Sequence, residues 1–87
     1  MNNLKTILIT GANRGIGLEL VKESLSKDFS VVGTFRNKQS SKNLLEISSN
    51  KLECLEMDVV DENSIAKASQ IIKQPIDYLI CNAGINN

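Results

Sequence analysis

Histidine is absent from this sequence of 87 residues, and its absence narrows the chemistry available to the chain. Without an imidazole, neither a Ser-His-Asp triad nor a Cys-His pair can be built. The only cysteines, Cys54 and Cys81, stand far apart in apolar, strand-like surroundings. A zinc site needs a closer cluster of ligands, and a nucleophilic thiol needs a neighbouring base. We therefore expect two buried free thiols and no metal site.

A net charge is also missing, because 10 lysine and arginine residues balance 10 aspartate and glutamate residues. No overall field favours nucleic acid or an anionic membrane surface, so any anion must be bound locally. No apolar run approaches the length of a membrane span, and the N-terminus lacks a basic segment followed by a long apolar one. We expect a cytoplasmic protein with no nucleic-acid partner and no membrane partner.

The most informative stretch is the glycine-rich turn Thr10-Gly11-Ala12-Asn13-Arg14-Gly15-Ile16-Gly17. It follows a β-branched apolar run, 6–9, and precedes apolar residues at helical spacing, 16–25. A strand that turns through glycines into a helix presents unpaired amides and the positive end of the helix dipole, where phosphate binds. The glycine spacing differs from both the general dinucleotide fingerprint and the P-loop. A strand-to-helix turn without a ligand is the alternative interpretation.

Strand and helix patterns alternate along the whole chain. After the first strand and helix we expect strands at 29–35, 51–57 and 76–81, a short serine-capped helix around 44–47, and a helix from the cap Asp61 to Lys73, before Pro75. The alternation predicts an α/β fold, a Rossmann-type doubly wound parallel sheet of about four strands in the order 3-2-1-4 with helices on both faces. The third strand is less apolar than the first and is expected nearer an edge.

The second expected strand ends in residues that bear on the choice of dinucleotide. An NAD site would place an acidic residue about 20 positions after the glycine turn. This sequence has Phe35 there, followed by Arg36. A guanidinium suits a 2′-phosphate because it offers bidentate, charge-assisted hydrogen bonds, and Arg14 in the turn could supply a second cation. The two arginines favour NADP over NAD, with a solvated surface charge as the alternative for each.

Two further polar features follow the ends of expected strands. Asp58, after the third strand, could accept a hydrogen bond from an adenine amino group or could satisfy backbone amides at a strand-helix junction. Asn82-Ala83-Gly84, after the fourth strand, is either an ordinary turn or a stretch of backbone that lies against the nicotinamide-side ribose. In a doubly wound sheet these features, the glycine turn and Arg36 converge on one crevice.

Assembled, these residues resemble the N-terminal half of a classical short-chain dehydrogenase/reductase, from about Lys5 to Ile85. The amino-acid sequence of the glycine turn, together with Thr34-Phe35-Arg36-Asn37 after it, is similar to the corresponding sequences in the carbonyl-reductase-like, C-factor and sniffer-type branch. The resemblance implies an NADP-dependent oxidoreductase that moves hydride to or from a small carbonyl or alcohol substrate. Residues 1–87 would be a single NAD(P)-binding Rossmann segment, an incomplete half of the full fold.

The resemblance also assigns roles to residues. Thr10 should tie the glycine turn to the region of the fourth strand, and Asn82 should brace that strand and the cofactor ribose. The full set of expected cofactor-binding residues is Thr10, Gly11, Asn13, Arg14, Gly15, Ile16, Gly17, Arg36, Asn37, Asp58, Val59, Asn82, Ala83 and Gly84.

Catalysis in the family resembles a Ser-Tyr-Lys arrangement, and those residues would lie beyond this chain. The only tyrosine, Tyr78, falls inside the fourth strand, and the residue four positions later is Asn82 rather than lysine. We therefore expect no catalytic residue here, and a Tyr78 that packs against a helix. Two alternatives are a short NADP-binding or sensing module without hydride transfer, and a structural remnant that pairs with a full-length relative. The open fourth strand could also support self-association.

Overall fold

The computed structural model describes residues 4–13, 15–37, 39, 41–58, 61–72 and 74–82. Strands and helices alternate through this part of the chain, as predicted. The elements are β1 (Thr6–Ile9), α1 (Gly15–Ser26), β2 (Ser30–Phe35), α2 (Lys42–Leu45), β3 (Leu52–Glu56), α3 (Glu62–Ile71) and β4 (Tyr78–Ile80).

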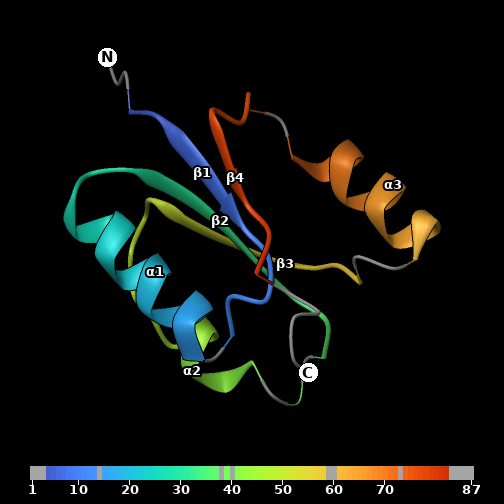
Figure 1. Cartoon of the computed structure of the whole chain (residues 1–87), viewed down its shortest axis with the longest axis horizontal. Helices are drawn as coiled ribbons and strands as arrows, with labels where there is room; N and C mark the ends of the chain where they lie inside the picture. Colours follow the sequence, from blue (N-terminus) through green and yellow to red (C-terminus); the bar gives the residue numbers. More distant parts are fainter. Residues whose placement is uncertain are drawn as a thin grey trace.

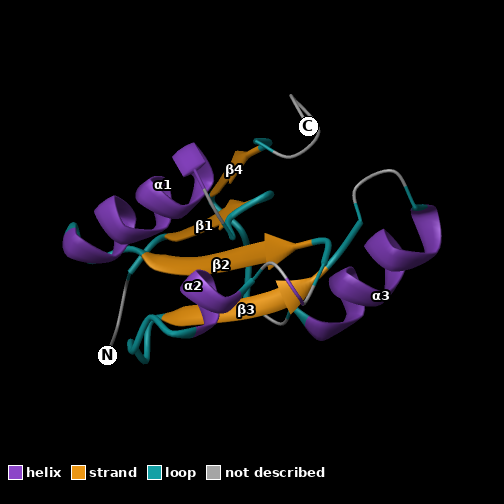
Figure 2. Cartoon of the chain, turned by 90° about the horizontal axis from the view of Figure 1, so that it is seen from below, coloured by secondary structure: helices purple, strands orange, loops and turns teal. Residues whose placement is uncertain are grey.

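The strands form one parallel sheet in the predicted order, β3-β2-β1-β4. β1 lies in the interior, where Leu8 pairs with Val32 on one side and with Leu79 on the other. Figure 2 shows the four arrows pointing the same way, with β3 and β4 at the outer positions. All the carboxyl ends therefore meet at one edge of the sheet, and the loops that follow them gather there.

Helices cover both faces of the sheet, with α1 and α2 on one side and α3 on the other (Figure 1). Side chains alternate between the two faces along each strand, as the period of two requires. The face under α1 and α2 buries Ile7, Ile9, Ala12, Leu18, Val21, Val31, Phe35 and Leu44. The face under α3 buries Leu8, Val32, Leu55, Met57 and Ala68. The doubly wound arrangement is confirmed.

The cover that α3 provides is thin. Within Glu62–Ile71 only Ala68 is buried, and Ile65 and Ile71 are 41% and 49% exposed. The helix ends at Ile71 rather than at residue 73, where the sequence pattern placed its end. The prediction of Asp61 as its cap is confirmed, since the Asp61 carboxylate accepts a hydrogen bond from the Asn63 amide at 3.0 Å.

The far end of α1 is fixed at the opposite edge of the sheet from the strand carboxyl ends. Asp28 adopts a left-handed backbone conformation, with φ of 67°, which ends the helix. The Lys51 ammonium, next to the start of β3, donates to the Leu25 carbonyl at 3.2 Å and to the Asp28 carboxylate at 2.8 Å. The hydrogen bond and charge of Lys51 hold the pKa of Asp28 below its usual value. A cation is thereby placed at the negative end of the helix dipole.

The expectation that both cysteines are buried is wrong, whereas a serine does take the cap position of α2. Cys81 is exposed and Cys54 is half-buried, because both lie on outer strands or just after them. Ser41 takes the cap position of α2 and is fully buried, but its side chain makes no capping hydrogen bond. Tyr78 packs edge-to-face on Phe29, between α1 and β2, with ring centroids 6.2 Å apart.

Candidate functional site

The turn between β1 and α1 adopts conformations that glycine tolerates best. Gly11 and Gly15 have φ values of 63° and 58°, in the left-handed region. Gly17 meets a different constraint, because a Cβ at this position would collide with the Gly11 carbonyl oxygen and stand 2.7 Å from the Asn82 Nδ2 atom. The glycines let α1 begin directly behind the turn, where the amides of its first residues have no partner within the helix.

The turn is anchored to both neighbours of β1. On one side the Ala12 amide donates to the Thr34 carbonyl of β2 at 2.8 Å. On the other side the Thr10 amide donates to the Ile80 carbonyl at 3.0 Å, and the Asn82 amide donates to the Thr10 hydroxyl at 2.9 Å. These contacts confirm that Thr10 ties the glycine turn to the fourth strand.

Asn82 also reaches the glycine turn through its side chain. Its Nδ2 atom donates to the Gly11 carbonyl at 3.2 Å, the same carbonyl against which Gly17 packs. Asn82 thus holds two consecutive residues that follow β1: its backbone amide binds Thr10, and its side chain binds Gly11. Residues from the two strand ends act as a single rigid platform.

A polar pocket of about 440 Å³ opens at the carboxyl ends of β2 and β3. Arg36 follows β2, Glu56 ends β3, and the rest of the lining comes from the segment that leads into α3 and from its first turns. The lining residues are Arg36, Glu56, Asp58, Asp61, Asn63, Ser64 and Lys67. The pocket brings together Arg36 and Asp58, two of the residues that the sequence selected.

The backbone of Asp58 is held at the junction between β3 and α3 by other residues, which tests neither of the two roles considered for its carboxylate. Its amide donates to the Ser64 hydroxyl at 2.8 Å, and its carbonyl accepts from the Asp61 amide at 3.0 Å. These two bonds fix the end of β3 against the first turn of α3. The Asp58 residue is half-buried at the pocket wall.

The other selected residues have different surroundings. Asn37 is exposed, and its side-chain oxygen accepts from the Gln39 amide at 2.8 Å, which forms a local turn after Arg36. Asn13 is half-buried in the glycine turn, and Ile16 is 72% exposed at the start of α1. Four further residues of the expected set, Arg14, Val59, Ala83 and Gly84, lie outside the described part of the chain.

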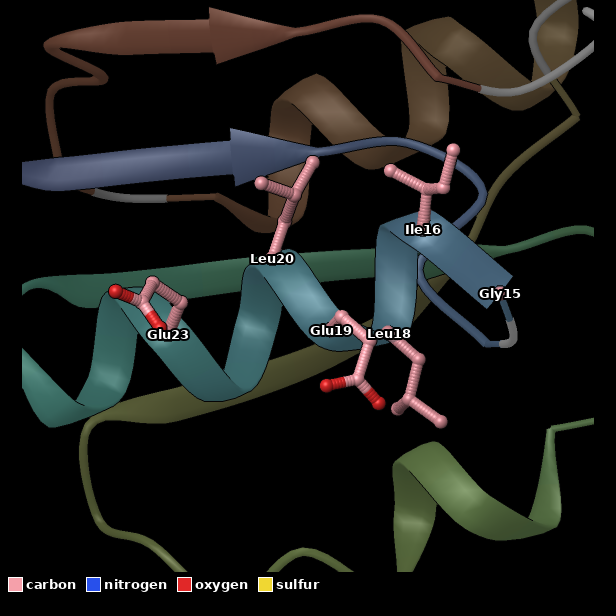
Figure 3. Close-up of a pocket in the computed structure, with 6 residues that line it drawn as sticks. All are labelled: Gly15, Ile16, Leu18, Glu19, Leu20 and Glu23. Atoms are coloured by element: carbon pink, nitrogen blue, oxygen red, sulfur yellow. The ribbon is translucent and has the colours of Figure 1, made fainter.

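A larger and mostly apolar hollow, of about 600 Å³, lies on the surface of α1 and is lined by Gly15, Ile16, Leu18, Glu19, Leu20 and Glu23. Figure 3 shows Ile16 and Leu20 on one side of the helix, and Leu18 and Glu19 on the other. Its charged lining residues are both glutamates, which would repel a phosphate. The polar pocket also has carboxylates but adds two cations, Arg36 and Lys67, so the carboxyl edge of the sheet is the better candidate for binding an anionic ligand.

Sequence reasoning did not select Glu56, Asp61, Asn63, Ser64 and Lys67 as site residues. A signal for two of them was present, because Ser64 and Lys67 follow the cap Asp61 by three and six positions and so share one face of α3. Among the described residues, no cluster of cysteine and acidic side chains could hold a metal ion. No helix in the described ranges is long and apolar enough to cross a membrane.

Comparison with known proteins adds independent information. The chain matches a family model described as short chain dehydrogenase over residues 5–87. Estradiol 17-beta-dehydrogenase 1 of Rattus norvegicus is 39% identical over 88 residues, which cover 90% of this chain and 26% of that protein. The fold and the glycine turn therefore occur here in a chain much shorter than this relative.

Solved structures match at the level of the whole fold. One, described as the carbonyl reductase Sniffer of Caenorhabditis elegans, has a TM-score of 0.80 and 29% identity, covering 95% of this chain and 38% of that one. Another, described as a short-chain dehydrogenase/reductase from Burkholderia multivorans with bound NADP, has a TM-score of 0.80 and 32% identity, covering 97% and 38%. The chain spans 26% to 38% of the length of these three proteins.

Proposed function

Because the chain belongs to the short-chain dehydrogenase family, we propose that residues 1–87 are the segment of such an oxidoreductase that binds the adenosine and pyrophosphate of a nicotinamide dinucleotide. The observation that carries this proposal is the glycine turn. Gly11 and Gly15 are left-handed, and Gly17 has no room for a side chain. The backbone can therefore approach a pyrophosphate closely, at the positive end of the α1 dipole.

The proposed binding residues divide by their place at the carboxyl edge. Residues of the glycine turn hold the pyrophosphate through backbone amides, and Ile16 offers an exposed apolar surface beside it. Thr10 and Asn82 position the turn, and Asn82-Ala83-Gly84 lies against the ribose on the nicotinamide side. Asp58, with Val59 after it, faces the adenine amino group.

We further propose that the dinucleotide is NADP rather than NAD. β2 does not end in the carboxylate that an NAD site would have. Its last residue, Phe35, is buried in the core, and the next residue, Arg36, lines the polar pocket. A 2′-phosphate in this pocket would meet the guanidinium, with Asn37 shaping the turn behind it and Arg14 as a second cation. The NADP in the related Burkholderia multivorans structure supports this choice.

The whole enzyme would transfer hydride between NADPH and a carbonyl or alcohol substrate, whereas this segment alone would not turn over. Its one tyrosine, Tyr78, is the first residue of β4 and packs on Phe29. The residue four positions after Tyr78 is not a lysine. A proton donor for the carbonyl oxygen is thus missing from these residues. Residues 1–87 would serve as a cofactor-binding unit without catalytic residues.

We also propose that the open edge of β4 promotes self-association of the isolated chain. Tyr78 and Leu79 face opposite sides of the sheet, and they are 49% and 61% exposed. An outer strand with apolar side chains on both faces and unpaired backbone groups is a template for another strand.

The cofactor proposal is tested by calorimetric titration of the chain with NADPH and NADH. We expect saturable binding of both, with NADPH bound at least about tenfold more tightly, since a charge-assisted hydrogen bond contributes about 1.5–3 kcal/mol. Arg36→Asp should weaken NADPH far more than NADH. Lys22→Asp makes the same charge change on α1, outside the polar pocket, and should leave both affinities unchanged.

Two results would count against these assignments. If the chain bound neither dinucleotide saturably, the proposed function would be wrong. If Arg36→Asp weakened NADPH and NADH equally, the segment would bind dinucleotides, but Arg36 would not contact a 2′-phosphate.

A further inference from the structure

Lys67 is a cation of the polar pocket to which the proposed function gives no role. It belongs to α3, whereas Arg36 follows β2, so the two cations reach the pocket from different elements of the fold. The helix that carries Lys67 comes from the opposite face of the sheet to α1 and its glycine turn. A ligand bound along the carboxyl edge would therefore meet Lys67 at its adenosine end and the glycine turn at its pyrophosphate.

The position of Lys67 is set by hydrogen bonds one turn earlier in α3. The Ser64 hydroxyl accepts from the Asp58 amide at 2.8 Å, and the Asp61 carboxylate caps the helix through Asn63. Residues three apart are neighbours on a helix surface, so the tie at Ser64 also holds Lys67 beside the end of β3. The side chain itself is exposed and can move on its four-carbon stem.

The polar pocket contains two cations, Arg36 and Lys67, and three carboxylates, Glu56, Asp58 and Asp61. The ion pairs found among the described residues join Lys22 to Glu19, Lys27 to Glu23 and Lys51 to Asp28, and all of them lie outside the pocket. Arg36 and Lys67 take part in none of them. One of the pocket carboxylates, Asp61, is already engaged at the start of α3. Neither Arg36 nor Lys67 forms an ion pair with Glu56, Asp58 or Asp61 in the described part of the chain, so both side chains can turn to a bound anion.

We propose that Lys67 is a specificity-determining residue that binds the phosphate on the adenosine 2′-oxygen together with Arg36. The inference rests on the proposed function, because it concerns the same ligand and the same pocket. Arg36 supplies a planar fork for two phosphate oxygens, and Lys67 supplies a mobile point charge from the other wall. Discrimination between NADP and NAD is thereby shared between β2 and α3.

The test uses ligands that carry only the adenosine half of the dinucleotide. The chain and its Lys67→Gln variant are titrated calorimetrically with adenosine 2′,5′-bisphosphate and with adenosine 5′-monophosphate. We expect Lys67→Gln to raise the Kd for the bisphosphate by about threefold to tenfold, the range for an exposed charge pair of about 1 kcal/mol, and to leave the monophosphate within about twofold. Lys67→Arg should retain the affinity for the bisphosphate, and Lys22→Gln serves as the control on α1.

Each other outcome has a distinct meaning. An unchanged bisphosphate affinity in Lys67→Gln, or equal losses for both ligands, would overturn the role of Lys67 while wild-type preference for the bisphosphate kept the proposed function intact. Failure of the wild-type chain to bind either ligand would overturn both. Far-ultraviolet circular dichroism of each variant checks that the fold is retained, and Lys67→Arg supplies the same comparison with the charge preserved.

Discussion

Replacing Gly17 by alanine should damage the fold and the binding site together. The added Cβ would overlap the Gly11 carbonyl oxygen and would stand 2.7 Å from the Asn82 Nδ2 atom and 2.9 Å from the Gly11 carbonyl carbon. Two of these three atoms are backbone atoms of the glycine turn, which cannot rotate away as a long side chain can. Relief requires α1 to move away from β1 or Asn82 to give up its hydrogen bond.

The cost follows from the same contacts. Forcing one methyl group into a packed site costs about 1–3 kcal/mol. Loss of the hydrogen bond from Asn82 to Gly11 adds about 1 kcal/mol. We therefore expect Gly17→Ala to lower the free energy of unfolding by about 2–4 kcal/mol, a large part of the stability that a domain of this size has.

Urea unfolding followed by circular dichroism at 222 nm measures this loss. With a slope of about 1 kcal/mol per molar urea for a small domain, the midpoint should fall by about 2 M or more. Gly33→Ala is the matched control, because its Cβ would meet the Ala12 Cβ at 3.2 Å and the Leu44 Cδ1 at 3.4 Å. Relief there requires the Ala12 Cβ to shift by only a few tenths of an ångström and the Leu44 side chain to rotate slightly, so the cost should stay below about 1 kcal/mol. Equal midpoints for the two variants would refute the steric argument.

The remaining predictions concern the outer strands. Iodoacetamide should alkylate exposed Cys81 faster than half-buried Cys54, whose pKa is raised by burial; mass spectrometry of the peptides should show this order, and the reverse would contradict the burial seen here. Because the folded-state pKa of Cys54 is raised, its stabilising contribution is complete below the pKa of the unfolded thiol and is lost as the pH rises through the folded-state pKa. Urea titrations at alkaline pH should therefore show a falling free energy of unfolding, and the fall should be smaller in Cys54→Ala. Leu79→Lys should lower self-association in sedimentation velocity runs, and a wild-type chain that stays monomeric at high concentration would exclude the β4 edge as a contact.

Much of the fold could be predicted from the sequence because local patterns carry it. The run 6–9 and the glycines after it specify a strand, a turn and a helix within a short stretch, and the alternation of elements leaves few strand orders. The cap Asp61 was also predictable, since its partner, the Asn63 amide, lies two residues away. Local chemistry of this kind needs no knowledge of the tertiary structure.

Features that depend on distant contacts could not be predicted in the same way. Cys81 looks like a core residue in sequence, but it follows an outer strand with no neighbour beyond it among the described residues. Ile65 and Ala68 lie three positions apart on α3, yet Ala68 is buried and Ile65 is 41% exposed, a difference that depends on how the helix packs against the sheet. Nothing in the sequence distinguishes Lys67 from other surface lysines, because the hydrogen bonds that join Asp58 to Ser64 and Asp61 bring its turn of helix to the pocket.

The contact between Thr10 and Asn82 joins residues that are 72 positions apart in the chain. During synthesis the glycine turn is made early, but Asn82, which anchors it on one side, is made 72 residues after Thr10. A growing chain would therefore hold the turn without its anchor until β4 has emerged and paired with β1, a non-local step with a high cost in loop closure. A ligand bound to the finished turn would in return favour the docked strand by mass action. In the cell, a nucleotide bound at the glycine turn would therefore stabilise the docked β4, the strand that completes the nucleotide's binding site.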